Sequence, residues 1–528
     1  MSNHAYESAA ALRPSSNGPI PISTLCERFS LAPASAEDAA ALNDLSILGV
    51  SVDSADTAPG ELFVGLPGFT VHGARFAADA VASGAVAVLT DADGAQIVHQ
   101  TAPGTPVLVY SDPRAVVGPL SAEVYHHPAR GLVTTAVTGT NGKTTTAYFL
   151  DAILSAHVGG CMVAGTVELR VGERSVESPR TTVEAPVLQR MMALAVEDRV
   201  GAASLEASSH AIVLHRLDGL VVDVAGFTNL QRDHLDFHKT MEGYLEAKAQ
   251  LFTPEHARRG VVCVDDQWGA TLAAEAPIEI DRVRAYPGET PADWWVSDAA
   301  VSLTDSATTF TLHGPDGEKI EASCPLPGLV NVQNAALALV MAIRAGVPAA
   351  TAAAALAGAH NIPGRMQRIS QRDGRRGLCI VDFAHTPDAM ELALKAVRPI
   401  TPGRLIVVFG SDGDRDQGKR PMLGEVCARL ADVLVVTDEN PRSEDPQLIR
   451  NAILEGVRGV RPDLTDVEEI TTWRGDAVRR GVELCGPDDT VIVTGKGHEP
   501  FLEMAGEFIR YNDAPVMAEA VEEKWGRA

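Results

Sequence analysis

The first pattern in this sequence that could support chemistry is a glycine-rich turn followed by a lysine and threonines. Residues 139–142 form the turn, and Lys143, Thr144 and Thr145 come directly after it. Backbone N–H groups of such a turn bind phosphate oxygens, a lysine reaches the outer phosphates, and a hydroxyl can bind Mg²⁺. Val137 occupies the place of the first glycine in the usual pattern, so the spacing differs from the standard one. The turn nevertheless predicts a nucleotide-binding site.

Three side chains could hold Mg²⁺ against the phosphates of that nucleotide. Thr144, Glu206 and His234 each follow a predicted strand and supply a hydroxyl, a carboxylate and an imidazole. Taken singly, such a histidine is more often a helix cap or a core residue, and such a glutamate is a solvated strand end. Their position beside the phosphate loop favours the metal site.

Three charged loops follow predicted strands in the last third of the chain. They span residues 410–420, 439–442 and 495–499, and each carries charged side chains, two of them among glycines. Any one of them could be a polar turn. Because they would meet at one edge of one sheet, together they predict a pocket for a zwitterionic small molecule.

The elements that must position these residues alternate between strand and helix. Val133–Val137 is β-branched and reads as a buried strand, and strands are also predicted to end at Glu206 and Thr228. Ligands of open α/β sheets collect at the carboxyl ends of parallel strands. Residues 281–324 alternate apolar and polar side chains and predict an antiparallel insertion.

The sequence predicts an α/β protein of three domains. Residues 1–19 are rich in Ala, Ser, Asn and Pro and are expected to be disordered. A small α/β domain follows at residues 20–130. Residues 131–363 form a central, P-loop ATPase-like domain with a parallel sheet, and residues 364–528 form a Rossmann-like domain.

Composition excludes several function classes. The formal charge is −25, from 44 basic and 69 acidic residues, which argues against nucleic acid or an anionic membrane as the main partner. Seven scattered cysteines without a C-x-x-C pair argue against disulfides and zinc sites and fit a reducing compartment. No apolar run approaches the ~20 residues of a membrane span. We expect a cytoplasmic protein.

Several motifs together resemble the Mur ligases of peptidoglycan synthesis. They are Thr138–Thr145 (TGTNGKTT), Glu206–His210 (EASSH), Asn229–Asp236 (NLQRDHLD), Gly328–Asn334 (GLVNVQN), Pro363–Arg365 (PGR), Asp382–Pro387 (DFAHTP) and Gly495–Glu499 (GKGHE). Their order and spacing cover nearly the whole chain beyond Ile20.

The resemblance implies an ATP-dependent amide ligase that forms ADP and phosphate through an acyl-phosphate intermediate. The acceptor would be UDP-N-acetylmuramoyl-L-alanyl-D-glutamate, and the added amino acid would be meso-2,6-diaminopimelate. ATP and Mg²⁺ are the implied cofactors. The first domain would bind the UDP substrate, the second ATP, and the third the amino acid, in a monomer that neither binds nucleic acid nor inserts into a membrane.

The resemblance also implies roles for individual residues. Catalytic positions are Lys143, Lys248 and His234. ATP-binding positions are Gly139, Thr140, Asn141, Gly142, Lys143, Thr144, Thr145, Asn331 and Arg365. UDP-substrate positions are Val52, Ser54, Thr181, Thr182, Ser208 and Arg216. Amino-acid positions are Arg415, Glu439, Asn440, Pro441, Arg442, Gly495 and Glu499. Metal positions are Thr144, Glu206, His234 and Lys248, the last as a carbamate.

Without the resemblance, two of these residues have an ordinary structural interpretation, which prevails for Lys248 and is evenly balanced with a phosphate contact for Arg365. Lys248 lies on a predicted helix, where a solvated face is the ordinary interpretation, and Arg365 could equally be a surface arginine of a linker. Glu439 departs from the family pattern, which has aspartate there. Two alternatives remain open: a lysine-adding or folylpolyglutamate-type ligase, and a P-loop ATPase that couples hydrolysis to a partner.

Overall fold

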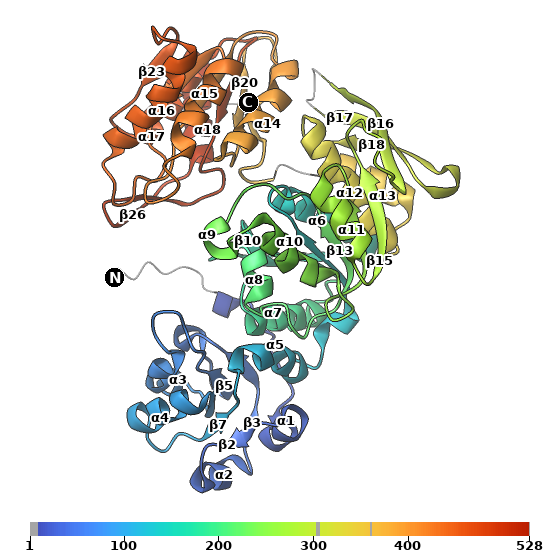
Figure 1. Cartoon of the computed structure of the whole chain (residues 1–528), viewed down its shortest axis with the longest axis vertical. Coiled ribbons are helices and arrows are strands. Elements are labelled where there is room, and N and C mark those ends of the chain that lie inside the picture. Colours follow the sequence, from blue (N-terminus) through green and yellow to red (C-terminus); the bar gives the residue numbers. More distant parts are fainter. Residues whose placement is uncertain (1–8, 303–306, 360–361, 527–528) are drawn as a thin grey trace. The chain divides into compact units, whose positions relative to one another are not determined.

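The computed structural model describes residues 9–302, 307–359 and 362–526. The chain forms two compact units. The first comprises the residues up to Trp294 together with Leu337–Ala355, and the second comprises Trp295–Ala336 and the residues from Leu356 onward. Figure 1 shows the helices and strands of both units. The predicted α/β class is confirmed.

A five-stranded sheet forms the core of the N-terminal part of the first unit. Its strand order is β2-β7-β6-β5-β4, parallel except for β2. Buried apolar residues pack on both faces of it. The elements are β1 (Ile20–Pro21), α1 (Ile22–Phe29), β2 (Ala32–Pro33), α2 (Ala36–Leu42), β3 (Ser46–Ile47), β4 (Gly49–Ser51), β5 (Glu61–Val64), α3 (Ala77–Ala82), β6 (Ala87–Thr90), α4 (Ala92–Thr101), β7 (Val107–Val109) and α5 (Pro113–Val124).

The segment ahead of the first strand is ordered where the structure describes it. Leu12 has no exposed surface and packs in the apolar core of the central sheet. Arg190, buried on α7 (Ala185–Glu197), donates hydrogen bonds to the carbonyl oxygens of Ala9 and Leu12. The expected disorder of residues 1–19 is therefore wrong from residue 9 onward, because tertiary contacts hold a segment whose composition alone predicts none. The first eight residues lie outside the described part.

We expect Leu12→Ala to lower the free energy of unfolding by about 2–5 kcal/mol, since it removes a fully buried side chain from a packed core. Leu48→Ala is the matched control, because 43% of Leu48 is exposed and surface substitutions change stability by only about 0.5 kcal/mol. Urea denaturation followed by circular dichroism measures both. Equal losses in the two variants would contradict the anchoring role of Leu12.

The central sheet of the first unit has the order β11-β10-β9-β12-β8-β13-β14-β15. Strands β9, β12, β8, β13, β14 and β15 are parallel, and β10 and β11 form an antiparallel edge. The elements are β8 (Val133–Thr138), α6 (Lys143–Val158), β9 (Cys161–Ala164), β10 (Glu168–Val171), β11 (Arg174–Glu177), β12 (Ala202–Glu206), α8 (Ser209–Val213), β13 (Val222–Phe227), α9 (Leu235–His238), α10 (Met241–Ala249), β14 (Ala257–Cys263), α11 (Gln267–Glu275) and β15 (Glu279–Arg284).

The predicted antiparallel insertion is confirmed, although it begins later than expected. Strand β15 still pairs in parallel with β14. The antiparallel part consists of β16 (Trp294–Val301), β17 (Thr308–His313) and β18 (Lys319–Cys324). Helices α12 (Leu329–Arg344) and α13 (Ala349–Ala357) follow it.

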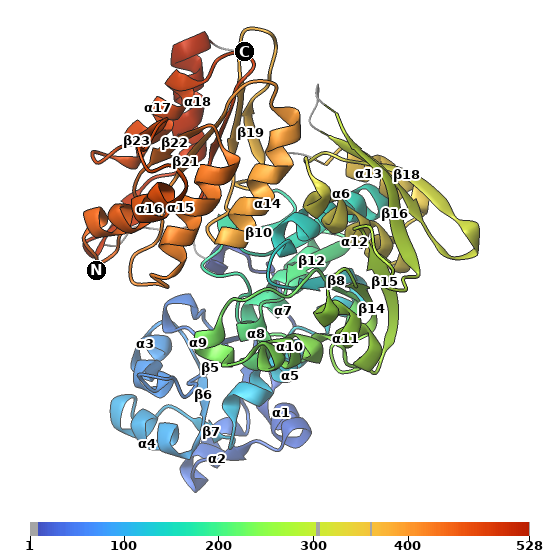
Figure 2. The same ribbon diagram turned by 45° about the horizontal axis from the view of Figure 1, so that its top comes forward.

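The C-terminal sheet of the second unit has the order β19-β20-β24-β21-β22-β23 and is parallel except for β19. Figure 2 shows α17 and α18 on one face of this sheet and α15 and α16 on the other. The elements are β19 (Gln367–Ser370), β20 (Leu378–Val381), α14 (Pro387–Val397), β21 (Leu405–Phe409), α15 (Lys419–Leu430), β22 (Val433–Val436), α16 (Pro446–Val460), β23 (Val467–Glu469), α17 (Arg474–Leu484), β24 (Thr490–Val493), β25 (Phe501–Met504), β26 (Glu507–Arg510) and α18 (Asp513–Trp525).

Candidate active site

The phosphate loop lies between β8 and α6, as the sequence predicts. Gly139 has a φ of 144°, and a Cβ atom there would lie 1.8 Å from Oγ1 of Thr228, so only glycine fits. The loop after β13 holds the turn in place. The Thr140 N–H donates to the carbonyl oxygen of Asn229 (2.9 Å), and Nδ2 of Asn141 donates to Oε1 of Gln231 (2.7 Å).

Lys143 Nζ folds back over this loop. It donates to the carbonyl oxygens of Gly139 and Thr140, both at 3.0 Å. The side chain therefore reaches the inside of the turn, where the phosphates of a nucleotide would be bound.

Thr144 and Glu206 meet beside the loop. Oγ1 of Thr144 donates to Oε2 of Glu206 at 3.0 Å, and the backbone N–H and hydroxyl of Thr166 donate to the same carboxylate at 2.8 and 2.9 Å. Glu206 is only 1% exposed. A hydroxyl and a carboxylate held this closely provide the hard oxygen ligands that Mg²⁺ prefers.

Lys248 is buried, so the interpretation of a solvated helix face is wrong. It is 1% exposed, its Nζ donates to the carbonyl oxygen of Gly139 at 2.8 Å, and it lies 4.4 Å from the ring centre of Tyr244. Burial lowers the pKa of the Lys248 amine well below its usual value, and the charge of Lys143 lowers it further, while Asp233 opposes the shift. The shift favours the neutral amine over the ammonium form.

His234 lies at the start of α9 with a left-handed backbone (φ 53°) and a half-exposed ring. The ring centre is 4.9 Å from that of His210. Burial lowers the pKa of His234, and the neighbouring Asp233 opposes this. The neutral ring can act as a metal ligand. In the part of the chain that the structure describes, no three His, Cys, Asp or Glu side chains gather as a metal cluster by themselves.

Four of the six predicted UDP-substrate residues lie beside Glu206. Oγ1 of Thr182 donates to the carbonyl oxygen of Glu206 (2.7 Å) and accepts from the N–H of Ser208 (3.0 Å). Arg216 donates to the carbonyl oxygen of Thr182 (3.2 Å), and the hydroxyl of Thr181 lies 3.1 Å from that of Thr166.

The other two, Val52 and Ser54, follow β4 of the N-terminal sheet. Asp56, two residues further on, forms an ion pair with Arg190 of α7 at 2.9 Å. The loop that carries both residues is thereby fixed to the central sheet.

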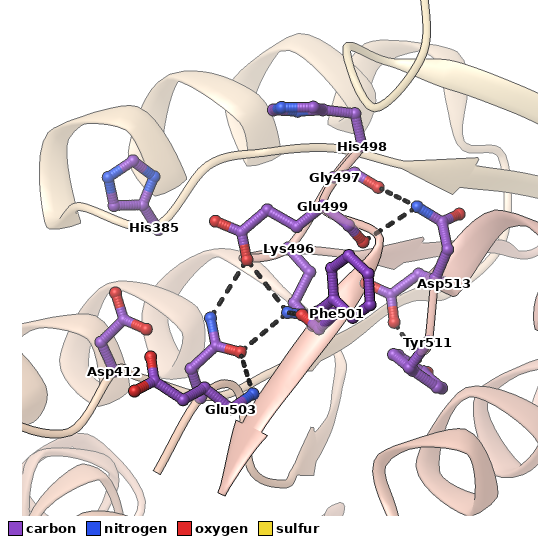
Figure 3. Close-up of polar contacts among 12 residues, drawn as sticks. His385, Asp412, Lys496, Gly497, His498, Glu499, Phe501, Glu503, Tyr511 and Asp513 are labelled. Carbon is purple, nitrogen blue, oxygen red and sulfur yellow. Dashed lines mark hydrogen bonds and ion pairs between the residues drawn. The ribbon is translucent and has the colours of Figure 1, made fainter. Parts of the chain in front are cut away.

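The three charged loops of the second unit follow β21, β22 and β24, which are neighbouring parallel strands. Their carboxyl ends therefore share one edge of the sheet, as predicted. Asn440 and Glu499 are in contact there (Nδ2 to Oε2, 3.1 Å), and Lys496 Nζ lies within 3.0 Å of both side chains. Figure 3 shows the contact between Lys496 and Glu499.

Glu439 is buried at this edge, and its Oε2 accepts no hydrogen bond among the described residues. Burial raises the pKa of Glu439 to about 8, and the negative charge of Asp412 raises it as well, whereas Lys419 and Arg474 lower it. The atom lies close to Gly495, where a Cβ would be only 2.6 Å from it. Gly495 has no side chain and thus leaves room for glutamate at position 439, where the family pattern has the shorter aspartate.

Arg442 has a left-handed backbone (φ 55°), and Pro441 precedes it. Its guanidinium lies 3.5 Å from Oε2 of Glu503 and 3.8 Å from Oδ1 of Asp412, and its Nε is buried without a hydrogen-bond acceptor among the described residues. Arg415 is exposed in the loop after β21. Arg442 therefore lies beside Asp412 and Glu503, and the roles of Arg442 and Arg415 in amino-acid binding stay predictions.

Asn331 and Arg365, predicted to contact the nucleotide, both belong to the second unit. Asn331 is buried on α12 and donates to the carbonyl oxygen of Pro327 at 2.8 Å. The guanidinium of Arg365 lies 4.3 Å from the ring centre of Phe383. Their role in nucleotide binding also stays a prediction.

Sequence reasoning missed several residues of these sites. Thr166 carries no motif signal, because only tertiary packing brings it to Glu206, whereas Tyr244 meets Lys248 through the spacing of four residues on helix α10. Lys496 lies inside a motif that was recognised, and a lysine among glycines could have drawn attention to it.

Family models match three stretches of the chain. The Mur ligase family catalytic domain matches residues 46–125, the Mur ligase middle domain matches residues 137–342, and the Mur ligase glutamate ligase domain matches residues 364–497. All helices among the described residues are too short or too polar to cross a membrane.

Curated relatives match the chain over most of its length. UDP-N-acetylmuramoyl-L-alanyl-D-glutamate–2,6-diaminopimelate ligase of Streptomyces avermitilis is 43% identical and covers 92% of this chain and 94% of its own. UDP-N-acetylmuramyl-tripeptide synthetase of Leifsonia xyli is 42% identical, with 95% and 96% covered. A solved structure of a UDP-N-acetylmuramoyl-L-alanyl-D-glutamate–2,6-diaminopimelate ligase is 31% identical, with a TM-score of 0.64 over 92% of this chain and 96% of its own.

Proposed function

Because this chain belongs to the Mur ligase family, we propose that it joins meso-2,6-diaminopimelate to UDP-N-acetylmuramoyl-L-alanyl-D-glutamate with conversion of ATP to ADP and phosphate. The observation that carries the proposal is the pocket after β21, β22 and β24. There a guanidinium, an amide and a carboxylate, from Arg442, Asn440 and Glu499, gather at one sheet edge. These groups suit an amino acid with two carboxylates and two ammonium groups.

A carboxylate is a poor electrophile, so the ligase must first activate it. An oxygen of the substrate carboxylate attacks the γ-phosphorus of ATP, the bond to the β-phosphate oxygen breaks, and ADP leaves. Phosphoryl transfer depends mostly on positioning and charge neutralisation. Lys143, already inside the phosphate loop, supplies positive charge at that point.

The amine of the amino acid then attacks the acyl carbon. The C–N bond forms, the amine loses a proton, and phosphate leaves with the electron pair of the broken C–O bond. Water must be excluded, because it would hydrolyse the acyl phosphate.

The side chains near the phosphate loop suit Mg²⁺. Thr144, Glu206 and His234 would hold it together with a carbamate on Lys248, and it would neutralise phosphate charge. The buried, hydrogen-bonded carboxylate of Glu206 and the neutral ring of His234 support this assignment. The burial of Lys248 and the lowered pKa of its amine support the carbamate, since only a neutral amine can attack CO₂.

The roles of the three domains follow the division that the resemblance implies. Residues 20–130 would bind the UDP substrate through Val52 and Ser54, residues 131–363 would bind ATP, and residues 364–528 would bind the amino acid. We propose that the protein is a cytoplasmic monomer. The seven free cysteine thiols support the cytoplasm, because disulfides are rare in that reducing compartment.

We expect Arg442→Ala to lower kcat/KM for diaminopimelate by roughly ten- to a few-hundred-fold, because a hydrogen bond to a charged group contributes about 1.5–3 kcal/mol. The KM for ATP should hardly change. Phosphate release measured with diaminopimelate and with L-lysine gives both constants. Arg429→Ala, on an exposed face of α15, is the matched control.

The same assay on the unaltered protein tests the function itself. A site built around a polar partner rejects an analogue that lacks it by roughly 10⁴-fold, so lysine should be a very poor substrate. Comparable kcat/KM for lysine and diaminopimelate would favour the lysine-adding alternative. If the rate of ATP hydrolysis does not change with any added amino acid, the alternative of an ATPase that couples hydrolysis to a partner is favoured.

A further inference from the structure

A buried lysine lies at the centre of the proposed amino-acid pocket. Lys496 is 0% exposed and is the third residue after the end of β24, following Thr494 and Gly495. Its Nζ has three acceptors: Oδ1 of Asn440 at 2.9 Å, Oε2 of Glu499 at 3.0 Å, and the carbonyl oxygen of Phe501 at 2.5 Å. Figure 3 shows Lys496 beside Glu499 and Phe501.

These three contacts use the full donor capacity of the side chain. A lysine ammonium has three N–H donors and no acceptor. With all three engaged by the protein, Lys496 has none left for a substrate. Its effect on ligand binding must therefore pass through the groups that it holds.

The lysine fixes which way the amide of Asn440 points. Oδ1 accepts from Lys496 and from the backbone N–H of Glu503 (3.2 Å), and both of these groups are only donors. The NH₂ group must then face the other side, where it donates to Oε2 of Glu499 at 3.1 Å. If the amide of Asn440 were flipped, its NH₂ group would face two other donors, Lys496 Nζ and the backbone N–H of Glu503.

The lysine also determines which oxygen of Glu499 remains for a ligand. Oε2 is occupied by Lys496 and Asn440, while the side chain as a whole is 36% exposed. Asn512 holds the same turn from behind by donating to the carbonyl oxygens of Gly497 (3.4 Å) and Glu499 (3.1 Å). Oε1 is thus the oxygen left to receive an ammonium group.

We infer that Lys496 is a positioning residue for amino-acid selection, which orients Asn440 and Glu499 for the incoming diamino acid without touching it. The inference rests on the proposed function and deepens it. It predicts a change in amino-acid recognition alone, since the phosphate loop belongs to the other unit.

The test replaces Lys496 by methionine, which keeps the length of the side chain and removes its donors. We expect Lys496→Met to raise the KM for diaminopimelate at least about tenfold and to reduce the preference for diaminopimelate over lysine. The KM values for ATP and for the UDP substrate should stay unchanged. Lys395→Met, at an exposed position on α14, is the matched control.

Asn440→Asp tests the same link if the methionine variant does not fold. Aspartate still accepts from Lys496 but cannot donate to Glu499, so the same loss of preference for diaminopimelate is expected. An unchanged preference in a folded variant of either kind would overturn the inference. Failure of the unaltered protein to use diaminopimelate would instead overturn the proposed function.

Discussion

Lys143→Ala is expected to lower kcat for ligation by about 10²–10³-fold or more while leaving the fold intact. Negative charge on the transferred phosphoryl group and on the departing ADP must be neutralised as the phosphoryl group moves, and Lys143 lies where it can do this. Loss of one such preorganised group costs about 10²–10³-fold in kcat. The side chain is only half-buried and bonds to two carbonyl groups of its own loop, so its removal leaves no packed core disturbed.

Turnover with saturating ATP measures this effect, and the thermal midpoint checks the fold. Lys239→Ala serves as the control, because Lys239 is an exposed lysine of the same unit. An unchanged turnover number for Lys143→Ala would remove the assignment of the phosphate loop.

Lys248→Ala is expected to be inactive but partly restored by added formate or acetate. The small carboxylate would occupy the space of the missing carbamate beside Gly139 and supply its negative charge. Lys143→Ala is the control here, since an anion cannot replace a missing cation. Activity measured against carboxylate concentration should rise in the first variant only.

A second readout does not depend on activity. Protein equilibrated with ¹³C-labelled bicarbonate should give a carbamate carbon signal that is absent from Lys248→Ala. An active alanine variant, or no difference between the two spectra, would rule out a carbamate at Lys248.

Much of the fold could be predicted because its strands have a simple composition. Leu405–Phe409 is predicted as a strand, and β21 has the same bounds. A short, continuous apolar run is typical of a strand that is buried on both faces of a parallel sheet. The segment around Leu12 was wrongly expected to be disordered. Its order depends on the buried Arg190, which is far away in the sequence.

The candidate sites were predictable where the chain itself brings residues together. The phosphate loop with Lys143 is such a case, since all of its residues are sequence neighbours. The burial of Lys248 was not predictable, because nothing in the surrounding helix distinguishes it from a solvated lysine. The same holds for the contact of Lys496 with Asn440, which lies 56 residues earlier in the chain, whereas its other two acceptors, Glu499 and Phe501, are near it in sequence.

The position of β24 has a consequence for synthesis of the chain. This strand is the last to join its sheet but lies between β20 and β21, with Leu378 opposite Thr490 and Ile406 opposite Val491. At about 5–20 residues per second, β20 and β21 leave the ribosome on the order of ten seconds before β24 does. During that interval both present unpaired apolar edges, which is the condition that promotes aggregation of nascent chains. Asn440 and Glu499 therefore cannot meet until translation has passed Glu499.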